Sequence, residues 1–166
     1  MGSMRRLAFT IAAVAVISLG LPSAASAKCI PTAKIKQVRF DFHTGEGKEP
    51  AVKYWGNWRC GSARAPGAWY HELMVVDRRG KVREFGRSGG GASGGLRRSG
   101  RIWRGFVQCR AFESLKRSGY KPLKVFHRLT LYKDESNRDK MARDDSRRLR
   151  LTNICPGYDP DGPPSR

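Results

Sequence analysis

The sequence predicts an all-β protein, a single-domain antiparallel β-sandwich or barrel of about seven strands with two disulfides. Three observations predict this fold. Short segments with apolar residues at every second position recur along the chain, Gly and Pro separate them, and no long amphipathic helix competes with them. The four cysteines are even in number and widely spaced. A hydrophobic content of 39% is too high for a disordered polymer, so we expect one packed domain.

Residues 1–27 have the features of a signal peptide. Arg5 and Arg6 form a positive region, residues 7–21 form an apolar run, and Ala25 and Ala27 fit the A-x-A pattern of signal peptidase. We therefore expect cleavage after Ala27 and secretion to the extracellular space. A lipid anchor is not expected, because a lysine instead of a small residue precedes the first cysteine.

The mature chain then consists of a β domain over residues 28–155 and a proline-rich tail over residues 156–166, which we expect to be disordered. Within the domain, residues 69–77 form a nearly continuous apolar run and predict a central strand. A tight turn through Gly80 joins this strand to the next as a hairpin. The seven predicted strands cover residues 34–43, 51–60, 69–77, 81–87, 102–112, 123–132 and 149–155.

Three further segments do not show strand periodicity. Residues 86–101 contain seven glycines and predict a flexible exposed loop. Residues 134–148 carry charges at helical i,i+4 spacing, so a short solvated helix is possible there. Residues 113–119 predict a single helical turn that ends at Gly119.

The cysteines predict two disulfides, because all four follow the expected cleavage site and no pair has the spacing of a metal knuckle. Three pairings are possible. We favour Cys29 with Cys155 and Cys60 with Cys109, since this nested arrangement ties the ends of the domain together and joins two predicted strands. No metal site and no cofactor are expected. A nucleotide cofactor is not expected because the glycine-rich segment lacks a G-K-[ST] sequence.

The charge balance points to an anionic partner. The chain has 33 Lys and Arg against 14 Asp and Glu, and loss of residues 1–27 still leaves a net charge of +17. Solubility alone requires a charge of about 2 to 8. We therefore expect binding to an anionic polymer, either nucleic acid, an acidic polysaccharide or a cell-wall polymer. The binding residues expected from the glycine-rich segment and the strand after it are Arg87, Arg97, Arg98, Arg101 and Arg104.

Aromatic residues add candidates for stacking on bases or sugars. The four tryptophans are Trp55, Trp58, Trp69 and Trp103, and we expect at least two of them to belong to the core. Direct action on anionic membranes is an alternative, although the sequence lacks the amphipathic helix that such proteins usually use. The oligomeric state does not follow from the sequence.

Two residues in predicted strands are candidates for acid–base chemistry. Glu72 is an acid inside the most apolar strand, and His127 lies on the apolar face of a later strand, where it is either a core histidine or a group that faces a pocket. Residues 70–75 resemble the strand that carries the general base in secreted microbial guanyl-specific ribonucleases. Arg97 and Arg101 resemble the phosphate-binding arginines of that family, and residues 127–131 resemble its general-acid strand.

This resemblance implies a second function, metal-free RNA cleavage by a secreted toxin. Glu72 would take the ribose proton, Arg101 with Arg97 would stabilise the phosphorane, and His127 would protonate the leaving oxygen. The chain departs from the family in lacking its long N-terminal helix and in having Phe126 and Arg128 beside the histidine. The residues alone favour a binding protein over an enzyme.

Overall fold

The computed structural model describes residues 28–39, 49–91, 96–136 and 138–163. The predicted signal peptide lies outside these residues. The described part is mostly β, with two short helices. The elements in chain order are β1 (Cys29–Arg39), β2 (Pro50–Cys60), β3 (Ala68–Val76), β4 (Val82–Gly91), β5 (Ser99–Gln108), α1 (Arg110–Arg117), β6 (Lys124–Tyr132), β7 (Lys140–Asp145), β8 (Leu149–Arg150) and α2 (Leu151–Ile154).

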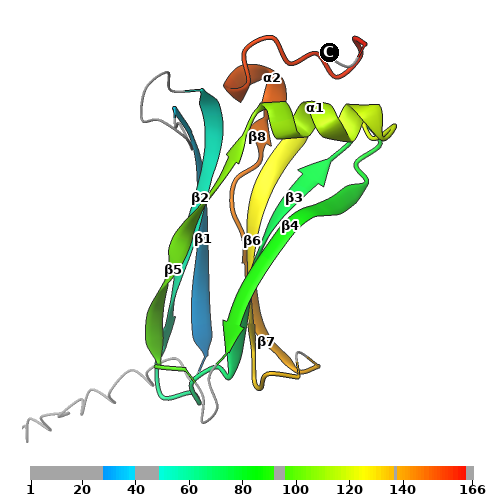
Figure 1. Cartoon of the computed structure of the whole chain (residues 1–166). Coiled ribbons are helices and arrows are strands. Elements are labelled where there is room, and N and C mark those ends of the chain that lie inside the picture. The colour runs from blue at the N-terminus through cyan, green and yellow to red at the C-terminus, as the bar shows by residue number, and fades with distance from the viewer. Residues whose placement is uncertain (1–27, 40–48, 92–95, 137, 164–166) are drawn as a thin grey trace, which may run out of the picture.

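The strands form two antiparallel sheets that face each other, with α1 and α2 at one end (Figure 1). One sheet has three strands in the order β1-β2-β5. The other has five, in the order β4-β3-β6-β7, with β8 paired to β6. The sheets approach at β1 and β7, where the Ala33 amide donates to Asp144 Oδ2 at 2.7 Å. In the described part of the chain, β4 and β5 do not pair with each other, so the barrel is not closed.

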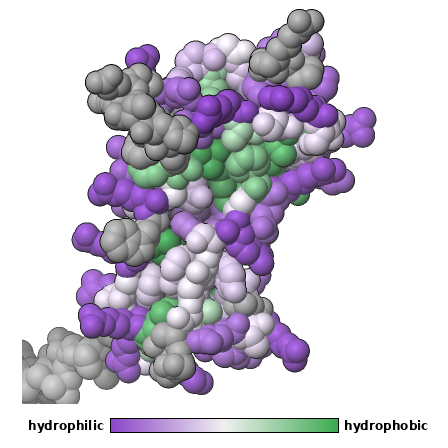
Figure 2. Space-filling model, viewed as in Figure 1, coloured by the Kyte–Doolittle hydropathy of each residue, from purple (hydrophilic) through white to green (hydrophobic). Residues whose placement is uncertain are grey.

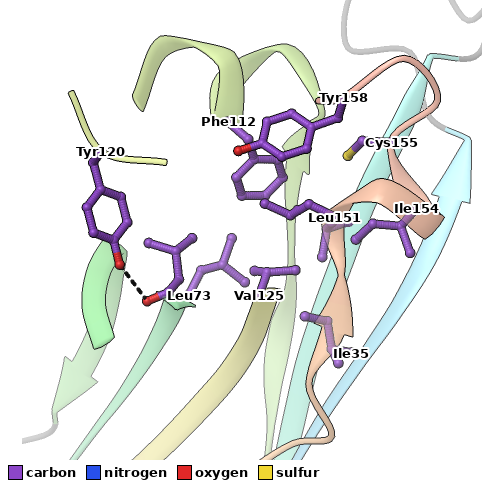
Figure 3. Close-up of a cluster of buried hydrophobic side chains, with 11 residues drawn as sticks. Ile35, Leu73, Phe112, Tyr120, Val125, Leu151, Ile154, Cys155 and Tyr158 are labelled. Carbon is purple, nitrogen blue, oxygen red and sulfur yellow. Dashed lines mark hydrogen bonds between the residues drawn. The ribbon is translucent and has the colours of Figure 1, made fainter. Parts of the chain in front are cut away.

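Apolar side chains from both sheets meet in the space between them. One cluster lies beneath the helices and combines Ile35 and Val52 of the three-stranded sheet with Leu73 and Val125 of the five-stranded sheet. Figure 3 shows Phe112 lying beside Tyr158 over this cluster. A second cluster contains Trp58, Ile102, Leu129 and Leu131. Apolar surface also gathers below α1, between the β5 and β4 edges (Figure 2).

The disulfides join Cys29 to Cys60 and Cys109 to Cys155, so the pairing favoured from the sequence is wrong. Cys29 and Cys60 face each other in the β1–β2 register. Cys109 follows β5 and lies beside Pro50, at the start of β2, because β2 and β5 are antiparallel. Cys60 and Cys109 are therefore at opposite ends of the sheet, roughly 30 Å apart at about 3.3 Å per residue, and cannot be bridged.

The glycine-rich segment is largely strand, where the sequence predicted a loop. Residues 86–91 continue β4, residues 99–101 begin β5, and residues 92–95 lie outside the described part. Two glycines of β4 pack against aromatic rings of β3. A Cβ on Gly89 would lie 2.5 Å from the Tyr70 ring, and one on Gly90 would lie 3.1 Å from Trp69. Close ring packing, more than flexibility, accounts for Gly89 and Gly90.

Residues 134–148 contain the strand β7 and not the helix that their charge spacing suggested. Their charges pair across strands, as Arg128 of β6 does with Asp145 at 2.8 Å. The helix at 113–119 is longer than the predicted turn and spans Arg110–Arg117, with Gly119 at φ 80 after its end. Only Leu149–Arg150 of the predicted last strand is extended, and α2 follows it.

The C-terminal segment packs on the domain through residue 163, so the predicted disorder does not hold for residues 156–163. Tyr158 is buried and donates a hydrogen bond to the Pro122 carbonyl at 2.7 Å. Lys116 of α1 is also buried, and its Nζ donates to the carbonyls of Asp159 at 2.6 Å and Pro163 at 3.2 Å. Residues 164–166 lie outside the described part.

Candidate functional site

Charge is divided unequally between the two sheets. The strands β1, β2 and β5 carry seven Lys and Arg residues and no Asp or Glu. The five strands of the other sheet also carry seven basic residues, but four acidic residues accompany them. The three-stranded sheet therefore has the stronger positive potential per strand, and we take it as the candidate binding element.

Six of the seven cations lie on the outer face of the three-stranded sheet, away from the core. The register determines this, because directly opposed residues share a face. Ile35 opposes Tyr54 on the inner face, so Lys36 and its partner Lys53 point outward. Asn57 opposes Arg101 on the same outer face. We call this surface the basic face, and it comprises Lys34, Lys36, Lys53, Arg59, Arg101 and Arg104.

The cations of the basic face have no carboxylate partner among the described residues, since none of the ion pairs there includes them. Five of the six are exposed and Lys53 is half-buried. The pKa of Lys53 is lowered, first by partial loss of hydration and then by repulsion from Arg104 and Lys36. Like charges thus lie close together on this face, and a bound anion would relieve their repulsion.

Two shallow depressions at β5 meet at Arg101. One, of about 580 Å³, is lined by Arg101, Ile102, Arg104 and Phe106. The other, of about 440 Å³, has Arg59 and Arg101 on its wall together with Ile30, Thr32, Asn57, Trp58, Ser99 and Gly100. Arg101 therefore lies where an extended ligand would pass from one depression to the other.

The five arginines predicted to bind fall into two groups. Arg101 and Arg104 belong to the basic face, and Arg97 and Arg98 lie just before β5, where their carbonyls accept from Trp58 Nε1 and the Cys60 amide. Arg87 is elsewhere. It lies on β4 of the five-stranded sheet, and its Nε donates to the buried carboxylate of Glu72 at 2.9 Å.

Sequence reasoning missed the cations on β1 and β2. Lys34, Lys36, Lys53 and Arg59 occupy the polar positions of alternating strands, which is also the pattern of an ordinary solvated face. A usable signal was the absence of Asp and Glu from both segments, since the long strands of the other sheet each carry at least one acid or pair with a strand that does.

The three residues of the ribonuclease-like hypothesis do not meet. Glu72 opposes Arg128 on the outer face of the five-stranded sheet, whereas His127 opposes Leu73 on the inner face. Arg101 lies on the outer face of the other sheet. The carboxylate, the imidazole and the guanidinium therefore point into three separate regions, and this arrangement does not form the acid–base pair that the resemblance implies.

His127 instead forms a buried ring cluster with His71 and Tyr54. The two imidazole centroids are 5.6 Å apart, and the Tyr54 ring lies 5.2 Å from His71 and 5.3 Å from His127. Within the described residues, no hydrogen bond is made by either ring nitrogen of His127 or by Nδ1 of His71. Burial, followed by repulsion from His71, lowers the pKa of His127 to about 4.

The tryptophans occupy different environments. Trp58 is buried in the second core cluster. Trp69 packs against the same cluster, and the edge of its ring meets His71. Trp55 opposes Lys34 and therefore belongs to the outer, basic face. The Trp103 side chain lies outside the described part of the structure. The sequence expectation that at least two tryptophans pack in the core agrees with Trp58 and Trp69.

The described residues contain no cluster of three or more His, Cys, Asp or Glu side chains that would suit a metal ion. In the same part of the chain, neither helix has the length and apolar character needed to cross a bilayer. Comparison with known protein families, curated proteins and solved structures finds no match to this chain.

Proposed function

We propose that this protein is an exported binding protein that holds an anionic polymer on the basic face of its three-stranded sheet. The observation that carries the proposal is the charge division between the sheets, with seven cations and no acid on β1, β2 and β5. Lysine and arginine side chains without carboxylate partners are available for phosphate, sulfate or carboxylate groups, and guanidinium suits bidentate contact with such groups.

Export and the sandwich fold are part of the same proposal. The two disulfides are typical of proteins that fold in an oxidising compartment. The A-x-A sequence before Lys28 supports cleavage there, and the two facing sheets support a sandwich open along the β4 and β5 edges. Mass spectrometry of the exported protein should then find Lys28 at its N-terminus. An N-terminus inside the apolar run would contradict this part of the proposal.

The test of binding compares two double variants that remove the same charge. Arg101→Gln with Arg104→Gln removes two cations from the basic face. Arg138→Gln with Lys140→Gln removes two exposed cations near β7, where no ion pair involves them in the described structure. Binding of heparin and of a single-stranded oligonucleotide to each protein is measured by fluorescence anisotropy.

We expect parent binding to weaken by about tenfold or more as salt rises from about 50 to about 200 mM, because each neutralised anion releases a counterion. The first double variant should bind more weakly than the parent and show a smaller salt slope, and the second should bind like the parent. Equal losses in the two variants would mean that net charge alone attracts the polymer, and the proposal would fail.

A further inference from the structure

Two aromatic rings lie among the cations of the basic face. Phe106 on β5 opposes Lys53 on β2, and Trp55 is the next outward-facing residue along β2. Lys53 Nζ lies 5.6 Å from the centre of the Trp55 ring and 5.7 Å from that of Phe106. The two ring centres are therefore at most about 11 Å apart, the sum of these distances.

These rings are on the side of the sheet that does not pack in the core. Their neighbours across the strands include the exposed Lys34 and the half-buried Lys53, whereas the inward-facing Trp58 and Ile102 are buried. Both rings are half-buried. Two large aromatic residues on a face otherwise rich in lysine and arginine are not needed for solubility. Their position suits contact with a flat ligand group.

Resting on the proposed function, we propose that the polymer is a single-stranded nucleic acid, with bases stacked on Trp55 and Phe106 and phosphates held by Lys53, Arg101 and Arg104. Every base has a π-face, so stacking on aromatic residues accepts any sequence, and a neighbouring cationic groove follows the backbone. Stacked bases repeat at about 3.4 Å, so the separation of the two rings accommodates bases of neighbouring or nearby nucleotides.

The depressions along β5 give the backbone a path. Phe106 lines the same depression as Arg104 and Arg101, and Arg101 leads into the second depression, where Arg59 lies. A single strand that stacks a base on Phe106 can therefore place its phosphates beside Arg104, Arg101 and Arg59, one after another along this path. A duplex has its bases paired and stacked inside, so it would contact the cations and would not stack on the rings.

The test measures affinity for four probes at physiological ionic strength: a single-stranded oligo-dT, the matching oligo-rU, a duplex of equal length, and heparin. The variants are Trp55→Ala, Phe106→Ala, the double variant Arg101→Gln with Arg104→Gln, and the conservative Trp55→Phe. Circular dichroism and a thiol assay establish that each variant keeps its fold and both disulfides.

We expect Trp55→Ala and Phe106→Ala each to weaken oligo-dT or oligo-rU binding by about tenfold. Binding to duplex and heparin should change by less than about twofold, since those probes use charge alone. Trp55→Phe should retain most of the single-strand affinity, because a ring remains for stacking. A preference between oligo-dT and oligo-rU identifies which nucleic acid the face prefers.

The possible failures are distinct. If the ring variants bind single strands like the parent while the arginine variant binds every probe weakly, single-strand stacking is refuted and the proposed polyanion function stands. If heparin binding depends on the rings and oligonucleotide binding does not, the ligand is an acidic glycan and the inference is wrong. If the arginine variant also binds every probe like the parent, the proposed function itself fails.

Discussion

Two histidine rings lie between the sheets, and among the described residues no hydrogen bond is made by either nitrogen of His127 or by Nδ1 of His71. His127 is 0% exposed and His71 is 5% exposed. Tyr54 contacts both rings, and backbone groups of Lys34 and Trp55 only partly oppose the loss of hydration that lowers the pKa of His127. Burial lowers the pKa of His71 as well. Both rings are therefore neutral in the folded protein at neutral pH, and protonation of either would place a charge in the core.

This cluster predicts a loss of stability in mild acid. The unfolded chain binds a proton at His127 with a pKa of 6.5, whereas the folded protein binds it at about 4. Between these values the unfolded state holds more protons, so the free energy of unfolding decreases as pH falls. From about pH 7.5 to about pH 5.0, His127 alone should cost on the order of 2 kcal/mol.

Urea unfolding at the two pH values measures this loss, with His127→Leu as the control. The variant removes the titrating group and should lose less stability over the same interval. The depressed pKa of Asp145 does not produce this effect, because its contribution is lost only as pH falls below its ordinary value of 3.8. A pH dependence identical in parent and variant would mean that His127 does not titrate as its burial implies.

At the scale of elements, the sequence was a good guide where large apolar side chains fill a strand. The apolar runs of β3 and β6 are buried on both faces for most of their length, and the sequence predicted both strands within a few residues. β1 was predicted to begin at residue 34, but it begins at Cys29. The prediction missed the first five residues because the inward-facing Cys29, Pro31 and Ala33 lack the large apolar side chains that make alternation visible in a sequence.

Composition misled where tertiary contacts decide the structure. In the sequence, Gly89 and Gly90 of β4 suggest a flexible loop, but in the structure the rings of Tyr70 and Trp69 pack against them. The charges of residues 134–148 fit a helix equally well until β6 provides a partner strand. The site shows the same limit. The excess of positive charge was evident, but which cations share a face depends on the β1–β2–β5 register, which no single segment encodes.

Close approach at a glycine predicts the next stability effect. Gly105 on β5 opposes Tyr54, and a Cβ there would lie 2.2 Å from the tyrosine ring, which both histidines hold in place. Gly105→Ala should therefore destabilise the protein by about 1–3 kcal/mol through overpacking. Gly86→Ala is the matched control, because a Cβ at Gly86 would meet nothing within 4 Å and the backbone there has no positive φ.

Thermal unfolding of the two variants measures the difference. Gly86→Ala should unfold at the parent temperature or slightly above it, because alanine restricts the unfolded chain. A Gly105→Ala variant as stable as Gly86→Ala would show that the Tyr54 ring moves aside without cost. The cluster of Tyr54, His71 and His127 would then be looser than its ring contacts suggest.

At the scale of the whole molecule, the fold concentrates repulsion on one sheet. The strands β1, β2 and β5 hold seven cations without an acid, and the Cys29–Cys60 disulfide joins the first two of these strands at one end. Acids are placed instead on the five-stranded sheet, where Glu72 pairs with Arg87 and Asp145 with Arg128. A surface kept positive in this way favours binding of anions at the expense of stability.

This arrangement predicts that salt acts in opposite directions on stability and on binding. Ions screen the repulsion within a chain of net charge +19, so the urea midpoint should rise between about 50 and about 500 mM NaCl, a range over which the screening length falls by more than half. Polymer binding should weaken over the same range, because the same ions compete for the basic face. The variant Arg101→Gln with Arg104→Gln should show smaller changes in both quantities, since it removes part of the repulsion and part of the binding surface together. A urea midpoint that falls with salt would mean that ion pairs such as Arg128–Asp145 contribute more to the salt dependence of stability than the repulsion does. The repulsion on the basic face would then not be the main electrostatic term that destabilises this fold.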